Sequence, residues 1–200
     1  MNALIGLDRE ADGTPVLELF ARLGFADCRV TLAYAAEYPG QVRGLIDISP
    51  IINAPTATPP VRPRGPMGPT PADIIAKSGM RGYLAAQSDS LYPPFLRKDP
   101  ARYARFVGLQ LSSDPASRIA TVRMASTGNF AEILPKVRCP ALMVATIYFK
   151  LRNPVTVQTL AAALPHGSFL AIPSGHLAAI ETPGLVAQTI NQFVGNSAPN

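Results

Sequence analysis

A histidine follows a predicted strand at a position suited to proton transfer. The run 168–173 is predicted to form a strand, and Ser174-Gly175-His176 comes directly after it. An imidazole titrates near neutral pH, so it can take a proton from a hydroxyl or a water molecule and return it to a leaving group. His176 is therefore a candidate general base. A loop histidine that is hydrogen-bonded only to backbone groups explains the position equally well.

A catalytic imidazole needs an acid that orients it and a nucleophile that it activates. Asp47, near the end of the predicted strand 42–49, is the candidate acid, although bracing the following turn is the commoner role for such a residue. Five hydroxyl or thiol groups are considered as nucleophile and none is chosen. Ser49 and Ser174 lie near strand ends but not on a strand-to-helix elbow, and Thr31 lacks flanking glycines. Cys28 is expected to be a buried, inert thiol, and Cys139 precedes Pro140 at a strand start, the wrong end of the sheet. His166 follows a predicted helix, at the opposite edge of the sheet, and is assigned to helix capping.

The elements that position these residues alternate between strand and helix. Strands are predicted at 27–30, 42–49, 137–146 and 168–173, and helices at 15–24, 31–40, 154–165 and 183–195. Alternation of this kind predicts an α/β fold with about four parallel strands flanked by helices. Functional residues in such sheets lie beyond the carboxyl ends of the strands, where His176 and Asp47 are expected.

The middle of the chain interrupts this alternation. The segment 54–71 is proline-rich, so neither a helix nor a sheet can use its missing N–H groups, and a loop is expected. Three helical patterns follow up to residue 132 and suggest a helical lid. The chain is thus divided into 1–53, the first part of the α/β core, 54–132, the loop and lid, and 133–200, the rest of the core. An interaction module that uses 54–71 as a ligand remains an alternative.

Several segments together resemble the α/β-hydrolase fold family, of the esterase and 3-oxoadipate enol-lactonase type, over about residues 15–195. The segments are LFARLGFADCRV, YAAEYPGQVRGLIDISP, ILPKVRCPALMVA and VQTLAAALPHGSFLAIPSGHLAAIETPGLVAQTINQFV. The resemblance implies hydrolysis of carboxylic esters or lactones, with His176 as general base and no cofactor. It also implies a small-molecule ester, lactone or acyl compound as the ligand.

The chain departs from this family at three places. No Gly-x-Ser-x-Gly elbow is present, since Val30 runs directly into Thr31. The early strands of the family, with part of the oxyanion hole, have no counterpart before residue 15. No Asp or Glu occurs between Glu132 and Glu181. We therefore expect an impaired hydrolase, or alternatively a truncated, non-catalytic member that binds ligands or partners. The strand at 27–30 would form an exposed sheet edge, through which a homodimer could form.

Composition narrows the remaining function classes. Hydrophobic residues make up 48% of the chain, which argues against disorder. The net charge is +5, but the basic residues are scattered, so nucleic-acid binding is not expected. The two cysteines and two histidines are too widely spaced for a structural zinc site. No apolar run is long enough to span a membrane and no secretory signal is recognised, so a cytoplasmic location is expected.

Overall fold

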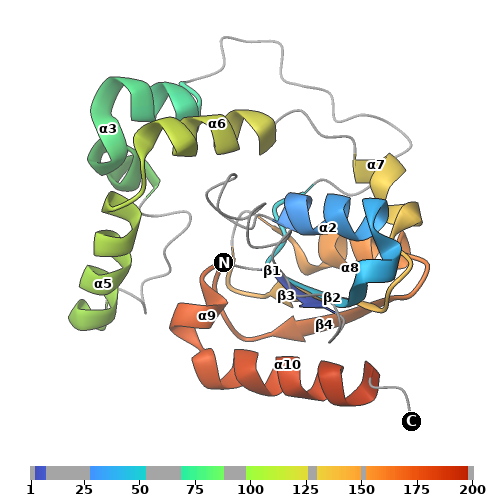
Figure 1. The fold of residues 1–200 in the computed structure, drawn as a ribbon. Coiled ribbons are helices and arrows are strands. Elements are labelled where there is room, and N and C mark those ends of the chain that lie inside the picture. Colours follow the sequence, from blue (N-terminus) through green and yellow to red (C-terminus); the bar gives the residue numbers. More distant parts are fainter. Residues whose placement is uncertain are drawn as a thin grey trace.

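A computed structural model describes residues 3–7, 28–52, 69–87, 98–125, 130–149 and 152–197. Their centre is a sheet of four strands in the order β1-β2-β3-β4. The strands are β1 (Ala3–Leu7), β2 (Val42–Ile48), β3 (Ala141–Thr146) and β4 (Gly167–Ile172). Strands β2, β3 and β4 are parallel, whereas β1 pairs antiparallel with β2 (Figure 1).

The predicted α/β class, with a parallel sheet between helices, is confirmed, but one strand was assigned wrongly. Residues 28–30 do not form a strand, because helix α2 spans Cys28–Glu37. Val30 is the only β-branched residue in that segment, and the leucine and alanines that follow favour a helix whose hydrogen bonds extend back to Cys28. The edge expected at 27–30 therefore does not exist, and β1 is an outer strand of the sheet instead. The helix predicted at 15–24 lies outside the described residues.

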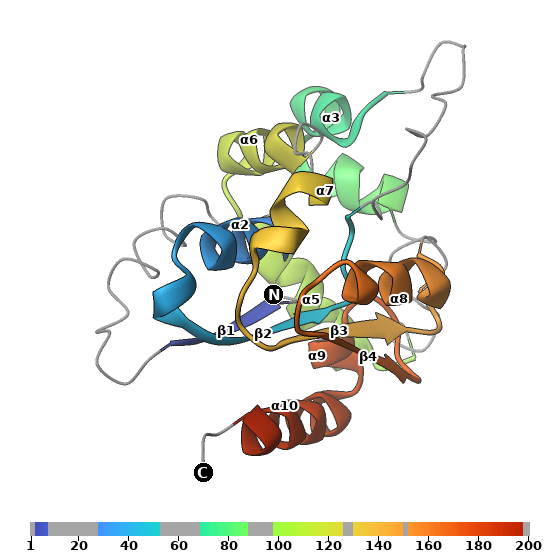
Figure 2. The same cartoon turned by 90° about the vertical axis from the view of Figure 1, so that its right-hand side faces the viewer.

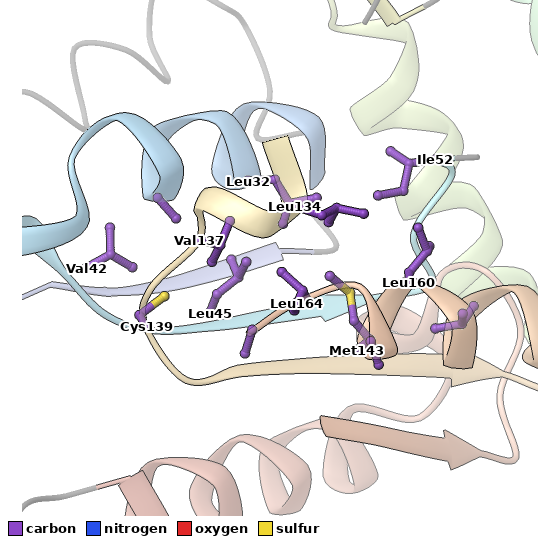
Figure 3. Close-up of a cluster of buried hydrophobic side chains, with 14 of the residues drawn as sticks. Leu32, Val42, Leu45, Ile52, Leu134, Val137, Cys139, Met143, Leu160 and Leu164 are labelled. Atoms are coloured by element: carbon purple, nitrogen blue, oxygen red, sulfur yellow. The ribbon is translucent and has the colours of Figure 1, made fainter. Parts of the chain in front are cut away.

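One face of the sheet is covered by α2, α7 (Phe130–Ile133) and α8 (Pro154–Ala162) (Figures 1 and 2). Leu45 of β2 and Met143 of β3 project into this layer and contact a cluster that includes Leu32, Leu134 and Leu160 (Figure 3). All five side chains are fully buried. Burial of side chains this size contributes about 1.5–3 kcal/mol each, so this cluster is the main support of the sheet.

Helix α10 (Pro183–Ser197) covers the opposite face, with the short helix α9 (Ala178–Glu181) beside it (Figure 1). Ile46 and Ile48 of β2 and Val144 of β3 belong to one buried cluster with Val186 of α10. Because β2 and β3 are buried on both faces, their sequences are nearly continuous apolar runs, which is why the sequence identified them. The carboxyl ends of β2, β3 and β4 lie at a common edge.

The middle of the chain forms α3 (Pro71–Gln87), α5 (Pro100–Leu111) and α6 (Pro115–Ala125), as the three helical patterns predicted. These helices gather to one side of the α/β layers (Figure 1). Their own small core contains Ile75, Tyr83 and Phe106, and it extends to Leu177 and Ile180. The insert thus packs against residues that follow His176 directly. Its action as a lid remains a prediction, and most of the proline-rich segment 54–71 lies outside the described residues.

Two features are absent from the described part of the chain. None of its helices is both long and apolar enough to cross a membrane. Nor do three or more His, Cys, Asp or Glu side chains gather there in an arrangement that would hold a metal ion.

Candidate active site

Three polar residues meet at the carboxyl edge of the parallel strands. Ser49 follows β2, Thr146 ends β3, and His176 lies in the loop after β4. The β3–β4 pairing continues beyond the strands, since the N–H of Ile147 donates to Ile172 O at 3.1 Å and that of Tyr148 to Ser174 O at 3.0 Å. These bonds hold the two loops together and fix where the histidine loop begins.

The imidazole of His176 is held on two sides. Its Nδ1 lies 3.0 Å from Ser49 Oγ, a contact between residues 127 positions apart in the sequence. The ring also stacks on Phe149, with 4.3 Å between the ring centroids and 18° between their planes. Together these contacts fix the position and the tilt of the ring. An ordered, half-buried imidazole at this edge fits the role that the sequence analysis predicted for His176.

Ser49 has an unusual backbone conformation for its residue type. Its φ is +58°, in the left-handed region that residues with a side chain rarely adopt. Its N–H donates to Val144 O at 2.8 Å, and its Oγ accepts a hydrogen bond from Thr146 Oγ1 at 2.9 Å. Backbone strain of this kind costs about 1–3 kcal/mol and concentrates at functional sites. Here it accompanies a serine side chain that contacts the histidine.

A half-buried carboxyl group, that of Glu181, fixes the loop on either side of His176. Glu181 accepts hydrogen bonds from the N–H of Gly175 at 2.9 Å and from the N–H of Leu177 at 3.0 Å. Burial raises the pKa of Glu181, and the two backbone hydrogen bonds lower it by less. The geometry makes Glu181 a support for the loop.

The predicted acid, Asp47, is fully buried within β2. It pairs in register with Met143 of β3, and strand alternation puts it on the same face as Leu45, towards α2 and α8. Its role as the acid that orients His176 remains a prediction. Ser49, which follows β2 two residues after Asp47, has its Oγ 3.0 Å from Nδ1 of the histidine.

The other residues discussed in the sequence analysis occupy different positions in the fold. Ser174 is buried in the histidine loop, where its Oγ accepts from Thr182 Oγ1 at 2.9 Å. Thr31 is fully buried on α2. His166 is exposed at the amino-terminal edge of the sheet, where its carbonyl accepts from the N–H of Ala141. Cys28 begins α2.

The sequence does not favour Ser49 as a nucleophile, because it does not stand on a strand-to-helix elbow. A usable signal was present nonetheless: Ser49 directly follows one buried parallel strand, as the histidine loop follows another. The carboxyl ends of parallel strands meet at one edge, so polar residues after two such strands can come into contact. The left-handed φ of Ser49 had no signal in the sequence.

No family model and no curated protein sequence matches the chain. Several solved structures resemble it in fold. The enol-lactonase from Burkholderia xenovorans LB400 superposes with a TM-score of 0.72 at 16% identity, over 90% of this chain and 70% of that one. A thermophilic esterase from Thermogutta terrifontis superposes with a TM-score of 0.73 at 20% identity, over 98% of this chain and 75% of that one. MGS-M2, an α/β-hydrolase enzyme from a deep-sea metagenome library, superposes with a TM-score of 0.67 at 20% identity, over 94% of this chain and 72% of that one.

Proposed function

Because the chain has an α/β-hydrolase fold with an ordered imidazole at the carboxyl edge of its sheet, we propose that it hydrolyses carboxylic esters or lactones. His176 is the general base in this proposal. The observation that carries it is the placement of the His176 ring between Ser49 and Phe149, beyond the ends of three parallel strands.

The chemistry requires one proton to be moved twice. His176 removes a proton from a water molecule as the water oxygen attacks the carbonyl carbon of the substrate. The same proton then passes to the oxygen of the departing alcohol, or of the opened lactone. The net reaction adds one water molecule across the acyl C–O bond. Imidazole suits both transfers because it accepts and releases a proton near neutral pH.

Exposed apolar side chains after two of the parallel strands support an acyl compound as the ligand. Ile147 and Tyr148 follow β3 and expose 46% and 53% of their surfaces. Ile51, which follows β2, is 37% exposed. The carboxyl ends of these strands share one edge of the sheet, and exposed large apolar side chains at such an edge are typical of ligand contacts. They favour an acyl chain over a highly charged substrate.

We expect turnover to be slow. The sequence contains no Gly-x-Ser-x-Gly elbow and no carboxylate residue between Glu132 and Glu181. The group at Nδ1 of His176 is a serine hydroxyl. A hydroxyl stabilises a protonated imidazole less than a carboxylate does. Proton uptake by the imidazole of His176 is therefore less favourable than it is in a triad with a carboxylate.

A matched pair of histidine substitutions tests the proposal. Hydrolysis of p-nitrophenyl butyrate and of a γ-lactone is measured for the wild type, His176→Ala and His166→Ala. A general base contributes about a hundredfold or more, so the first substitution is expected to remove most of the activity. His166→Ala changes an exposed histidine at the opposite edge and should leave the rate unchanged. Equal activity in both variants would refute the role given to His176.

A second candidate function is the binding of an acyl ligand without turnover. The observation that favours it is that Ser49 is only 2% exposed and is engaged by two partners, so it does not resemble an accessible nucleophile. Calorimetric titration with hexanoate, together with labelling by a fluorophosphonate probe, separates the two functions. Saturable hexanoate binding without hydrolysis or labelling would favour binding alone.

A further inference from the structure

A chain of hydroxyl groups ends on the catalytic candidate. Thr146 Oγ1 donates to Ser49 Oγ at 2.9 Å, and Ser49 Oγ lies 3.0 Å from His176 Nδ1. Thr146 is 3% exposed and Ser49 is 2% exposed, so water has little access to either hydroxyl. Buried hydroxyl groups keep fixed hydrogen-bond directions because no solvent competes for them.

The direction of the first hydrogen bond determines the second. A serine hydroxyl carries one proton and two lone pairs. The proton of Thr146 occupies one lone pair of Ser49, and the proton of Ser49 itself still needs an acceptor. Among the described contacts of Ser49, Nδ1 of His176 is the acceptor within reach. An Nδ1 that accepts a hydrogen bond carries no proton, so the neutral ring carries its proton on Nε2.

We propose that the Thr146–Ser49 pair fixes His176 as the Nε2–H tautomer in its resting state. The consequence for hydrolysis rests on the proposed function, whereas the tautomer follows from the contacts. Thr146 and Ser49 are positioning residues here, because they act through His176.

The proposed tautomer explains why hydrolysis should be slow. In a Ser-His-Asp triad the carboxylate accepts from Nδ1–H, which leaves Nε2 bare to take a proton. A neutral donor at Nδ1 imposes the opposite tautomer, and that change costs about 10⁴-fold in turnover in the triad enzymes. In this chain the bare Nε2 needed by a general base would arise only from the less populated tautomer.

A nucleophilic role for Ser49 fits the structure less well. In the hydrolase elbow, the N–H of the residue after the nucleophile stabilises the oxyanion. The residue after Ser49 is Pro50, which has no N–H to donate. With only 2% of its surface exposed, Ser49 is also poorly placed to meet a carbonyl carbon. A role in setting the state of His176 uses the contacts that Ser49 does make.

Nitrogen NMR of the ring tests the tautomer without any need for activity. The chain has two histidines, so ¹⁵N-histidine labelling of His166→Gln leaves only the His176 ring signals. At about pH 8, where an ordinary imidazole is neutral, we expect a bare Nδ1 and a protonated Nε2. A protonated Nδ1 would overturn the inference. Thr146→Val removes one hydroxyl at nearly constant volume and should give a mixture of tautomers; an unchanged spectrum would overturn the part assigned to Thr146.

A matched pair at Ser49 tests the functional consequence. Ser49→Asp and Ser49→Asn have similar shapes and both tolerate a left-handed backbone, but only the aspartate can accept from Nδ1–H without donating. We expect Ser49→Asp to move the proton to Nδ1 and to hydrolyse p-nitrophenyl butyrate at least tenfold faster than Ser49→Asn. Equal tautomers and rates in two folded variants would overturn the inference. Absence of hydrolysis in every variant would instead refute the proposed function, while the wild-type spectrum still decides the tautomer.

Discussion

Glu181 supports the loop that carries His176, and its removal should be costly. In Glu181→Ala the N–H groups of Gly175 and Leu177 both lose their acceptor. A buried N–H left without a partner costs about 1–3 kcal/mol, so we expect the free energy of unfolding to fall by roughly 2–5 kcal/mol. Because burial raises the pKa of Glu181, removing the carboxylate also relieves a desolvation cost, and the lower half of that range is expected.

Urea unfolding and thermal melting measure this loss. For a chain of this size the expected change corresponds to a fall in Tm of about 2–4 °C per kcal/mol. Glu37→Ala, which removes an exposed glutamate at the end of α2, is the matched control and should change stability by less than about 0.5 kcal/mol. Hydrolysis should also fall by about a hundredfold in Glu181→Ala, because the ring of His176 is no longer held in place. A melting temperature equal to that of the control would refute the supporting role.

The pH dependence of stability provides a second check on Glu181. Its ordinary pKa is 4.5, and burial raises the value in the folded state. The folded chain therefore binds this proton more tightly than the unfolded chain does. The stability contributed by the group is fully present below pH 4.5 and is lost as the pH rises through the folded-state pKa. Glu181→Gln should remove this dependence, and an identical pH profile in wild type and variant would contradict the shift.

Three further predictions concern the scaffold. A Cβ at Gly167 would lie 2.0 Å from Ala161 O, so Gly167→Ala should unfold well below the wild-type melting temperature, whereas Gly40→Ala, with nothing within 4 Å, should melt close to it. Burial raises the pKa of the Cys139 thiol, so in a Cys28→Ser background iodoacetamide should react with the protein in urea and hardly at all in buffer; fast reaction in buffer would contradict the burial. If a homodimer forms through a sheet edge, size-exclusion chromatography should show twice the monomer mass at micromolar concentration, and a monomer at all concentrations would exclude it.

The buried strands were predictable because a strand that is buried on both faces has a nearly continuous run of apolar residues. The run 42–49 became β2, and the apolar part of 137–146 became β3. Helix α10 was predicted from Pro183 at its start, since proline suits the first helical turn. In each case the local preference of the residues and their packing in the fold agree, and such agreement makes a prediction safe.

The errors arose where local sequence says little about tertiary context. Four residues at 27–30 carried too weak a preference to decide between a strand and the first turn of α2. The contact between Ser49 and His176 joins positions 127 residues apart, and its geometry depends on a left-handed φ at Ser49. No periodicity in the sequence reports such a contact. The placement of His176 was predictable because a single strand, β4, ends just before it.

The most direct test of the account is whether an acyl ligand meets the ring of His176. In His166→Gln protein labelled with ¹⁵N-histidine, hexanoate is added while the Nε2 resonance is followed. We predict a saturable shift of that resonance, which Phe149→Ala weakens because the ring loses its stacking partner. A resonance that stays unchanged up to tens of millimolar hexanoate, in a protein that also fails to hydrolyse p-nitrophenyl butyrate, would contradict the placement of a functional imidazole at this edge of the sheet.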